Sequence, residues 1–152
     1  MNTPPDTPAV CSGSSLGLLF RQVRDAMWAR MERELAAAGH ELNFSQYITL
    51  KTLAYGSSGT TELARAAYLH PGAMTRLLDK LEERGLIARD AVPGDRRAVQ
   101  IRLTDAGNAL WKEISPSAQR VHDQAMANLS EAEQTELTRL LMQVRDNLAA
   151  ED

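Results

Sequence analysis

Two pairs of polar residues in the middle of the chain carry groups suited to binding a polyanion. Thr75 and Arg76 lie in a stretch whose apolar residues have helical spacing, and Arg96 and Arg97 are adjacent at a Pro-Gly turn. Arginine presents a planar fork of N–H donors that can bind phosphate, or the edge of a guanine, through two hydrogen bonds. Because adjacent arginines at a turn repel one another and gain nothing by burial, we expect them to meet external negative charge.

The charge of the chain is divided between a basic middle and an acidic end. The net charge is −3 over 152 residues, yet the segment from Arg65 to Arg102 holds eight Lys or Arg residues against five Asp or Glu. After Leu129, six acids stand against two arginines. We therefore expect only the middle of the chain to touch a polyanion such as double-stranded DNA.

Composition and motifs exclude several other classes of protein. The single cysteine, Cys11, rules out an internal disulfide and a cysteine-rich zinc site. The histidines (His40, His70 and His122) lack metal-ligand spacing, so no metal is expected. The sequence contains no phosphate-binding Gly-Lys-Ser/Thr motif, no Gly-x-Ser-x-Gly motif of a nucleophilic serine and no glycine fingerprint of a dinucleotide site. We therefore expect neither an enzyme nor a cofactor. Without a long apolar run or a secretory signal in Met1–Pro8, the chain is predicted to be cytoplasmic, with no membrane partner.

The first half of the chain is predicted to be helical. A first amphipathic helix begins at Leu16 and is stopped by Gly39. Ser45 can cap a second helix, and either Gly59 or Thr60 starts a short third one.

A fourth helix and a hairpin complete the predicted central domain. Pro71 suits the first turn of this helix, and Gly85 ends it. The short third helix, the tight turn and the amphipathic fourth helix form a helix-turn-helix. Strands at 86–89 and 99–103, joined by a turn at 92–95, form a wing in which Val99, Ile101 and Leu103 alternate with polar residues. The buried face of the fourth helix is expected to hold Met74, Leu77, Leu78 and Leu81.

The helices at the two ends of the chain need a partner surface. Thr104 can cap a long helix beginning at Asp105, which Pro116 either kinks or splits, and Ser130 to Glu133 fits a capping box. The terminal apolar stripes have little to cover inside so small a central domain, so we expect a homodimer to bury them. The stripe residues expected at the dimer interface are Leu16, Leu19, Phe20, Leu137, Leu140, Leu141, Val144 and Leu148.

The predicted fold is mainly α with a small β-hairpin wing, a winged helix-turn-helix with N- and C-terminal dimerisation helices. Residues 1–15 form a flexible N-terminal tail, and 16–40 the N-terminal dimerisation helix. Residues 41–104 form the DNA-binding domain, and 105–152 the C-terminal dimerisation helices.

The exposed side of the fourth helix supplies the candidate base readers. Recognition helices place their N-terminal side chains in the major groove, so the candidates there are Gly72, Ala73, Thr75, Arg76 and Lys80. At the wing the candidates are Asp95, Arg96 and Arg97, with Asp95 expected to orient Arg97 through a paired hydrogen bond. The candidate phosphate contacts are Thr60, Thr61, Arg65 and His70.

Two segments of the sequence resemble the MarR family of regulators. Residues 95–107 resemble the family's wing followed by its Leu-Thr-x-x-Gly helix start, and residues 74–87 its recognition helix and first wing strand. The resemblance covers roughly residues 16–149. It implies a sequence-specific transcriptional regulator, by analogy a repressor, that binds a pseudo-palindromic operator as a homodimer and inserts Arg97 into the minor groove.

The resemblance also implies an effector, because many relatives release DNA when a small aromatic or phenolic ligand enters a cleft beside the dimer helices. The candidate pocket residues are Arg21, Arg24, Trp28, Met31, His40, Phe44 and Tyr47. The aromatic and methionine members of this set fit an ordinary core equally well. A redox-responsive regulator using Cys11 and a helical protein-interaction module without DNA binding are the alternative hypotheses.

Overall fold

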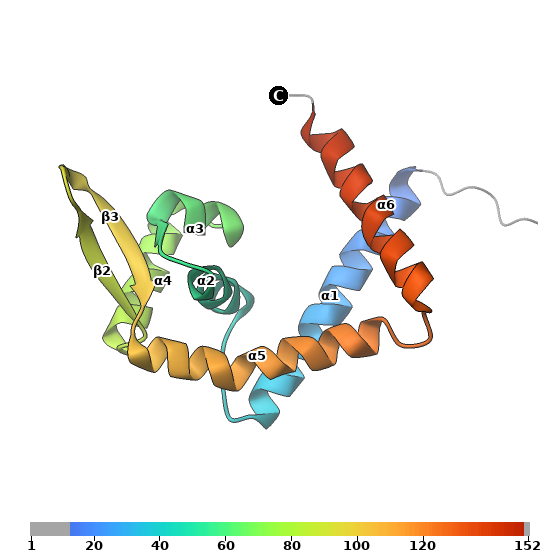
Figure 1. Cartoon of the computed structure of the whole chain (residues 1–152), viewed down its shortest axis with the longest axis horizontal. Helices are drawn as coiled ribbons and strands as arrows, with labels where there is room; N and C mark the ends of the chain where they lie inside the picture. Colours follow the sequence, from blue (N-terminus) through green and yellow to red (C-terminus); the bar gives the residue numbers. More distant parts are fainter. Residues whose placement is uncertain (1–12, 151–152) are drawn as a thin grey trace, which may run out of the picture.

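Six helices and a three-stranded sheet make up the part of the chain described by the computed structural model, residues 13–150 (Figure 1). In chain order they are α1 (Gly13–Ala37), α2 (Phe44–Ala54), β1 (Ser58–Gly59), α3 (Thr60–Ala66), α4 (Pro71–Glu83), β2 (Ile87–Val92), β3 (Asp95–Leu103), α5 (Asp105–Ala125) and α6 (Glu131–Ala149). The predicted helical fold with a hairpin wing is confirmed. Cys11 and residues 1–12 of the predicted tail lie outside the described residues. The predicted start of the first helix at Leu16 is wrong by one turn, because residues 13–15 already belong to α1.

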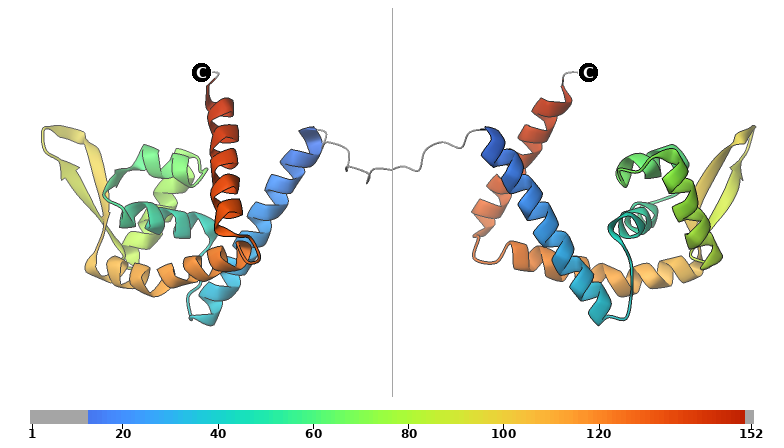
Figure 2. Two further views of the ribbon diagram at one scale, coloured as in Figure 1. Left: turned by 45° about the vertical axis from the view of Figure 1, so that its right-hand side comes forward. Right: turned by 180° about the vertical axis from the view of Figure 1, so that it is seen from behind.

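The helix α5 spans the distance between two separate groups of elements. Its first turn lies at the base of the β2–β3 hairpin, and its later turns cross α1 (Figure 1). At the far end of α5 the chain turns into α6, which lies away from the central domain in Figure 1 and in the right view of Figure 2. We call residues 41–104, which hold α2 to β3, the central domain. It projects from the three long helices α1, α5 and α6.

The core lies where α2, α3 and α4 meet β3 and α5. Leu50, Leu63, Met74 and Ile114 are among its fully buried side chains. The predicted inner face of α4 is confirmed, because Met74, Leu77, Leu78 and Leu81 are all buried. This burial fixes which side of α4 faces solvent.

The sheet contains one strand that the sequence analysis did not predict. β1 pairs antiparallel with β3, placing Ser58 opposite Ile101, while β2 pairs with the other edge of β3. The predicted alternation along β3 is correct for Ile101 and Leu103, which are buried, but wrong for Val99, which is 40% exposed. Val99 lies towards the tip of the hairpin, beyond the reach of the core.

Helix caps explain most of the helix boundaries. Thr104 and Ser130 cap α5 and α6 as predicted, but α2 is capped by Asn43 and not by Ser45. Asn43 Oδ1 accepts from the backbone N–H of Gln46 at 2.8 Å, and Gln46 Oε1 accepts from the backbone N–H of Asn43 at 3.0 Å. This reciprocal pair satisfies two helix-end donors. Helix α5 continues through Pro116 without being split.

A close backbone contact joins the start of α5 to the end of α4. Thr104 Oγ1 donates to the Gly85 carbonyl at 2.5 Å and accepts from the Gly107 N–H at 3.1 Å. Gly107 is buried, and a Cβ at this position would overlap the carbonyl oxygen of Leu86. The glycine therefore lets the first turn of α5 approach the base of the wing.

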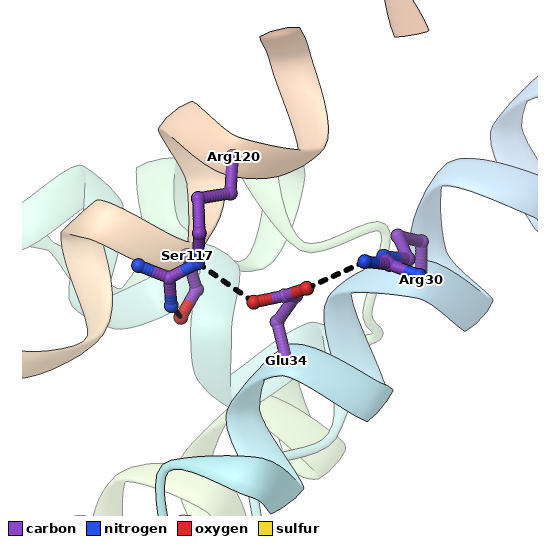
Figure 3. Close-up of polar contacts among 4 residues, drawn as sticks. All are labelled: Arg30, Glu34, Ser117 and Arg120. Atoms are coloured by element: carbon purple, nitrogen blue, oxygen red, sulfur yellow. Dashed lines mark hydrogen bonds and ion pairs between the residues drawn. The ribbon is translucent and has the colours of Figure 1, made fainter. Parts of the chain in front are cut away.

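A polar cluster joins α1 to α5 where the two helices cross (Figure 3). Glu34 Oε2 accepts from Arg120 Nε at 2.7 Å, and Glu34 Oε1 accepts from Arg30 Nη2 at 2.9 Å. Arg120 also donates to the buried Ser117 hydroxyl at 3.0 Å. The hydrogen bond from Arg120 is the main reason that the pKa of Glu34 lies below its ordinary value. The carboxylate therefore stays charged and links the two helices.

Candidate nucleic-acid interface

The outer face of α4 presents the predicted recognition residues to solvent. Gly72, Ala73, Thr75, Arg76 and Lys80 are all exposed. The Thr75 hydroxyl donates to the Pro71 carbonyl within the helix at 3.0 Å, which holds the side chain against the first turn. Arg76 and Lys80 extend from the same face one turn apart, so this side of α4 offers two positive charges to a ligand.

The wing tip presents the second predicted set. Asp95, Arg96 and Arg97 are exposed at the start of β3, and Gly94 takes the φ of +86° that the preceding turn requires. The expected pairing of Asp95 with the guanidinium of Arg97 is not the contact found. Asp95 Oδ1 accepts instead from the backbone N–H of Arg97 at 3.0 Å, so the carboxylate fixes the turn and leaves the guanidinium free to project.

Ion pairing divides the cations of the chain into two groups. Within residues 13–150, the Lys and Arg side chains without an ion-pair partner lie mostly in the central domain: Lys51, Arg65, Arg76, Lys80, Arg84, Arg96 and Arg97. The other two are Arg33 and Lys112. Most arginines on α1, α5 and α6 bind carboxylates of the chain itself. The unpaired positive charge is therefore concentrated on the recognition helix and the wing.

Two arginines on the wing strands neutralise acids of the recognition helix and of the wing. Arg89 on β2 contacts Asp79 at 2.9 Å and Glu82 at 3.3 Å. Arg102 on β3 contacts Asp90 on β2 at 2.6 Å. These pairs have no signal in the sequence, because the partners lie on different elements and only the fold brings them together. They reduce the repulsion that these acids would exert on a phosphate backbone.

The candidate phosphate contacts surround the start and end of α3. Thr61, Arg65 and His70 are exposed, and Thr60 is half-buried. The start of the helix is fixed by Glu62, whose Oε2 accepts from the Ser58 hydroxyl at 2.8 Å and from the Gly59 N–H at 3.1 Å. The Ser58 hydroxyl is the main cause of a lowered pKa for Glu62.

A cavity of about 510 Å³ lies on the α1 side of the central domain. It is lined by Arg24, Asp25, Trp28, Phe44, Ala67 and Tyr68. Three of the predicted pocket residues are therefore among its lining: Arg24, Trp28 and Phe44. Asp25, Ala67 and Tyr68 were not predicted.

The other predicted pocket residues do not line this cavity. Met31 and Tyr47 are buried in the core, where burial raises the pKa of Tyr47. Arg21 lies 3.8 Å from Asp25 in an exposed ion pair. His40 is half-buried, and its Nε2 lies 3.0 Å from a carboxylate oxygen of Glu113 on α5.

Aromatic rings and one ion pair define the chemistry of the cavity wall. Trp28 meets Phe44 edge to face, with ring centroids 5.2 Å apart. Behind them, Tyr47 lies 6.0 Å from Trp28 and 5.8 Å from Trp111, so aromatic contacts continue into the core. Arg24 donates twice to Asp25 Oδ1, at 3.0 and 2.8 Å. The cavity therefore offers flat apolar surfaces beside a paired charge.

Apolar side chains remain exposed along α1 and α6. Within residues 13–150, no side chain of α6 is buried. Most of the predicted interface residues are at least 37% exposed (Leu16, Leu19, Phe20, Leu137, Leu140, Leu141 and Leu148), and Val144 is half-buried. Val23, Met27 and Met142 extend the same exposed set. Exposed apolar side chains in such numbers on two helices are typical of a protein interface.

Two other features are missing from residues 13–150. No helix there is long and apolar enough to cross a membrane. No group of three or more His, Cys, Asp or Glu side chains in that part of the chain could hold a metal ion.

Comparison with known proteins connects this geometry to a family. Residues 42–99 match the model of the MarR family. The repressor NicR of Pseudomonas putida is 28% identical over 96% of this chain and 89% of its own length. The solved structure of the transcriptional regulator PA3341 is 32% identical, with a TM-score of 0.79 over 88% of this chain and 98% of that one. NadR in complex with 4-hydroxyphenylacetate has a TM-score of 0.75 and 25% identity over 99% of this chain and 100% of that one.

Proposed function

Since this chain belongs to the MarR family of winged helix-turn-helix transcriptional regulators, we propose that it represses transcription as a homodimer on a pseudo-palindromic operator. The operator is released when a small aromatic ligand fills the cavity beside α1. The family consists of regulators and not of enzymes, and the proposal assigns this chain no catalytic step.

The concentration of unpaired cations on α4 and the wing carries this proposal. Arg76 and Lys80 on α4 suit the major groove, and Arg96 and Arg97 suit the adjacent minor groove, whose negative potential attracts arginine. Neutralisation of Asp79, Glu82 and Asp90 by arginines of the wing leaves this surface net positive. A chain with an overall charge of −3 can therefore still bind DNA through one side.

The exposed stripes on α1 and α6 support a second copy of the chain as the partner. Two copies joined by these helices would carry two recognition helices related by a two-fold axis. Such an arrangement fits an operator with two half-sites a whole number of helical turns apart.

The cavity supports an aromatic effector. Trp28, Phe44 and Tyr68 can pack against a flat ring, and the Arg24–Asp25 pair can exchange hydrogen bonds with a hydroxyl or carboxylate. NadR, which binds 4-hydroxyphenylacetate, has the same fold. An effector panel for this chain consists of phenol, benzoate, nicotinate and 4-hydroxyphenylacetate, with cyclohexanecarboxylate as the non-aromatic control.

The test is DNA binding by the full chain, at low and moderate salt, to genomic fragments that include its own upstream region. We expect a dimer to bind one fragment specifically, and we expect its affinity for that DNA to fall steeply as salt rises. The double variant R96A/R97A should lose most of this affinity. The double variant K51A/K112A removes the same charge from unpaired cations outside the recognition helix and wing, and it should bind as the original chain does.

Two outcomes would contradict the proposal. Equal losses in the two double variants would mean that net charge, and not the wing, decides binding. If no fragment of a whole-genome library bound, the apolar stripes would instead favour a protein-interaction module without DNA binding.

A further inference from the structure

The backbone at Tyr68 has a conformation that usually selects glycine. Three helices of the chain end in the same pair of hydrogen bonds, in which the residue after the cap has a positive φ. At the ends of α1 and α4 this residue is Gly39 or Gly85, with φ of +83° and +70°. At the end of α3 it is Tyr68, with φ of +54°.

The hydrogen bonds confirm that the three ends are equivalent. The Leu69 N–H donates to the Ala64 carbonyl at 2.9 Å, and the Tyr68 N–H donates to the Arg65 carbonyl at 3.2 Å. The bonds that surround Gly39 and Gly85 follow the same spacing. A side chain with a Cβ is strained in this backbone conformation, and only Asn and Asp tolerate it well among non-glycine residues. The fold alone therefore favours glycine at position 68.

Packing within the described chain does not compensate for this strain. Tyr68 is 89% exposed, so its ring adds little to the core. The ring instead contributes to the wall of the 510 Å³ cavity, together with Trp28 of α1 and Phe44 of α2. A strained and exposed aromatic residue at the mouth of an aromatic cavity points to a role in binding.

We propose that Tyr68 is an effector-contacting residue, which packs its ring against a planar aromatic ligand in the cavity. This inference rests on the proposed function, because it assumes that the cavity binds an aromatic effector. Tyr68 belongs to the turn of the helix-turn-helix, and only Leu69 and His70 separate it from the first residue of α4. A ligand held between Trp28 and Tyr68 therefore contacts both the dimerisation helix α1 and the segment that positions the recognition helix.

Variants of Tyr68 separate the ring from the backbone strain. Tyr68→Gly removes both, Tyr68→Ala removes the ring but keeps a Cβ, and Tyr68→Phe keeps the ring without the hydroxyl. Tyr55→Ala is the matched control, because Tyr55 is also exposed (83%) but has a negative φ of −91° and does not line the cavity.

The experiment measures release of bound DNA by each member of the effector panel, together with DNA affinity and melting temperature without ligand. We consider each aromatic ligand of the panel that releases DNA from the wild-type chain. For the same release, the Gly and Ala variants should need roughly three- to tenfold more of that ligand. The Phe variant and the Tyr55 control should respond as wild type does. Tyr68→Gly should melt at or above the wild-type temperature, and roughly 2–4 °C above Tyr68→Ala.

Each failure has a distinct result. If Tyr68→Gly released DNA at the wild-type ligand concentration, the role of Tyr68 would be refuted while the effector cavity stood. If it lowered the melting temperature and the ligand-free DNA affinity, Tyr68 would be a structural residue. If the wild-type chain bound DNA but no ligand of the panel released it, the effector part of the proposed function would be refuted. The role of Tyr68 would be refuted with it.

Discussion

At the scale of single residues, the two cations on the exposed face of α4 offer different chemistry to DNA. Arg76 carries a planar fork that can bind guanine O6 and N7 together, whereas Lys80 is a flexible point charge better suited to a phosphate. Both side chains are exposed and lack an ion-pair partner within residues 13–150. Their substitutions should therefore have different effects on sequence preference.

We expect Arg76→Ala to weaken binding to the preferred operator by about 1–3 kcal/mol and to relax the preference at one base pair. Lys80→Ala should weaken binding to all sequences by a similar factor and lower the salt dependence. Competitive binding against operators with single substitutions would measure both effects. If Arg76→Ala weakened binding equally for all operator sequences, Arg76 would contact the phosphate backbone and not a base.

At the scale of elements, α5 is held at one end by a backbone contact that only glycine permits. Any side chain at Gly107 would overlap the Leu86 carbonyl, which belongs to the turn between α4 and β2. We expect Gly107→Ala to destabilise the fold by roughly 2 kcal/mol, because the first turn of α5 must shift away from the wing base. Denaturant unfolding would measure this, with Ala106→Gly as a control at the exposed neighbouring position.

The contact between α1 and α5 is expected to depend on pH through Glu34. Its pKa lies below the ordinary value because Arg120 hydrogen bonds to the carboxylate. A carboxyl group with a lowered pKa stabilises the folded state above its ordinary pKa of 4.5 and loses that contribution as pH falls through the lowered value. We therefore expect Glu34→Gln to lower the melting temperature at pH 7, and the difference from wild type to shrink as pH falls below 4.5.

Glu136→Gln is the matched control for this pH dependence. Glu136 also has a lowered pKa, through its hydrogen bond with Arg139, but the two lie on one exposed helix turn and connect no elements. Its substitution should have a smaller effect at pH 7. A melting difference for Glu34→Gln that persisted unchanged at low pH would mean that the carboxylate charge does not join α1 to α5.

The elements that could be predicted from sequence are those with a local signal. The periodic apolar face of α4 and the capping residues Thr104 and Ser130 gave correct boundaries, because propensity and tertiary packing agree there. β1 was missed, since two residues form no pattern and become a strand only by pairing with β3. The α2 boundary was wrong because Asn43 and Ser45 are both good caps, and the bond to Gln46 decides between them.

The candidate site shows the same division. Arg76, Arg96 and Arg97 were placed correctly on exposed faces, because helix periodicity and turn residues define those faces locally. Tyr68 was missed as a cavity-lining residue, since its position there depends on three elements meeting and on a backbone angle that no spacing reveals. Met31 and Tyr47 were named as pocket candidates, but their side chains point into the core.

At the scale of the whole molecule, we expect the exposed stripe of α6 to form part of the proposed dimer interface. Leu137 and Leu141 lie one turn apart and are 37% and 42% exposed. We expect Leu137→Glu with Leu141→Glu to convert the dimer to a monomer, because two charges would be buried unpaired in the interface. Sedimentation would show the change in mass.

The same double variant should bind DNA far more weakly, since one monomer reaches only one half-site. Asn147→Glu, at an exposed polar position of α6, should leave the dimer intact. A double variant that stayed dimeric and bound DNA normally would move the interface away from α6.

Because α5 is long, a small tilt at its contact with α1 would cause a large displacement of the DNA-binding surface at its other end. Its 21 residues make a rod about 30 Å long, with the wing base at one end and the crossing with α1 near the other. The contact with α1 at Arg120 lies about 22 Å from the start of α5. A tilt of about 8° at that crossing would displace the wing end by about 3 Å, close to the 3.4 Å rise of one base pair. A small change in the angle between α1 and α5 is therefore enough to shift the DNA-binding surface of one protomer by about one base pair relative to its half-site.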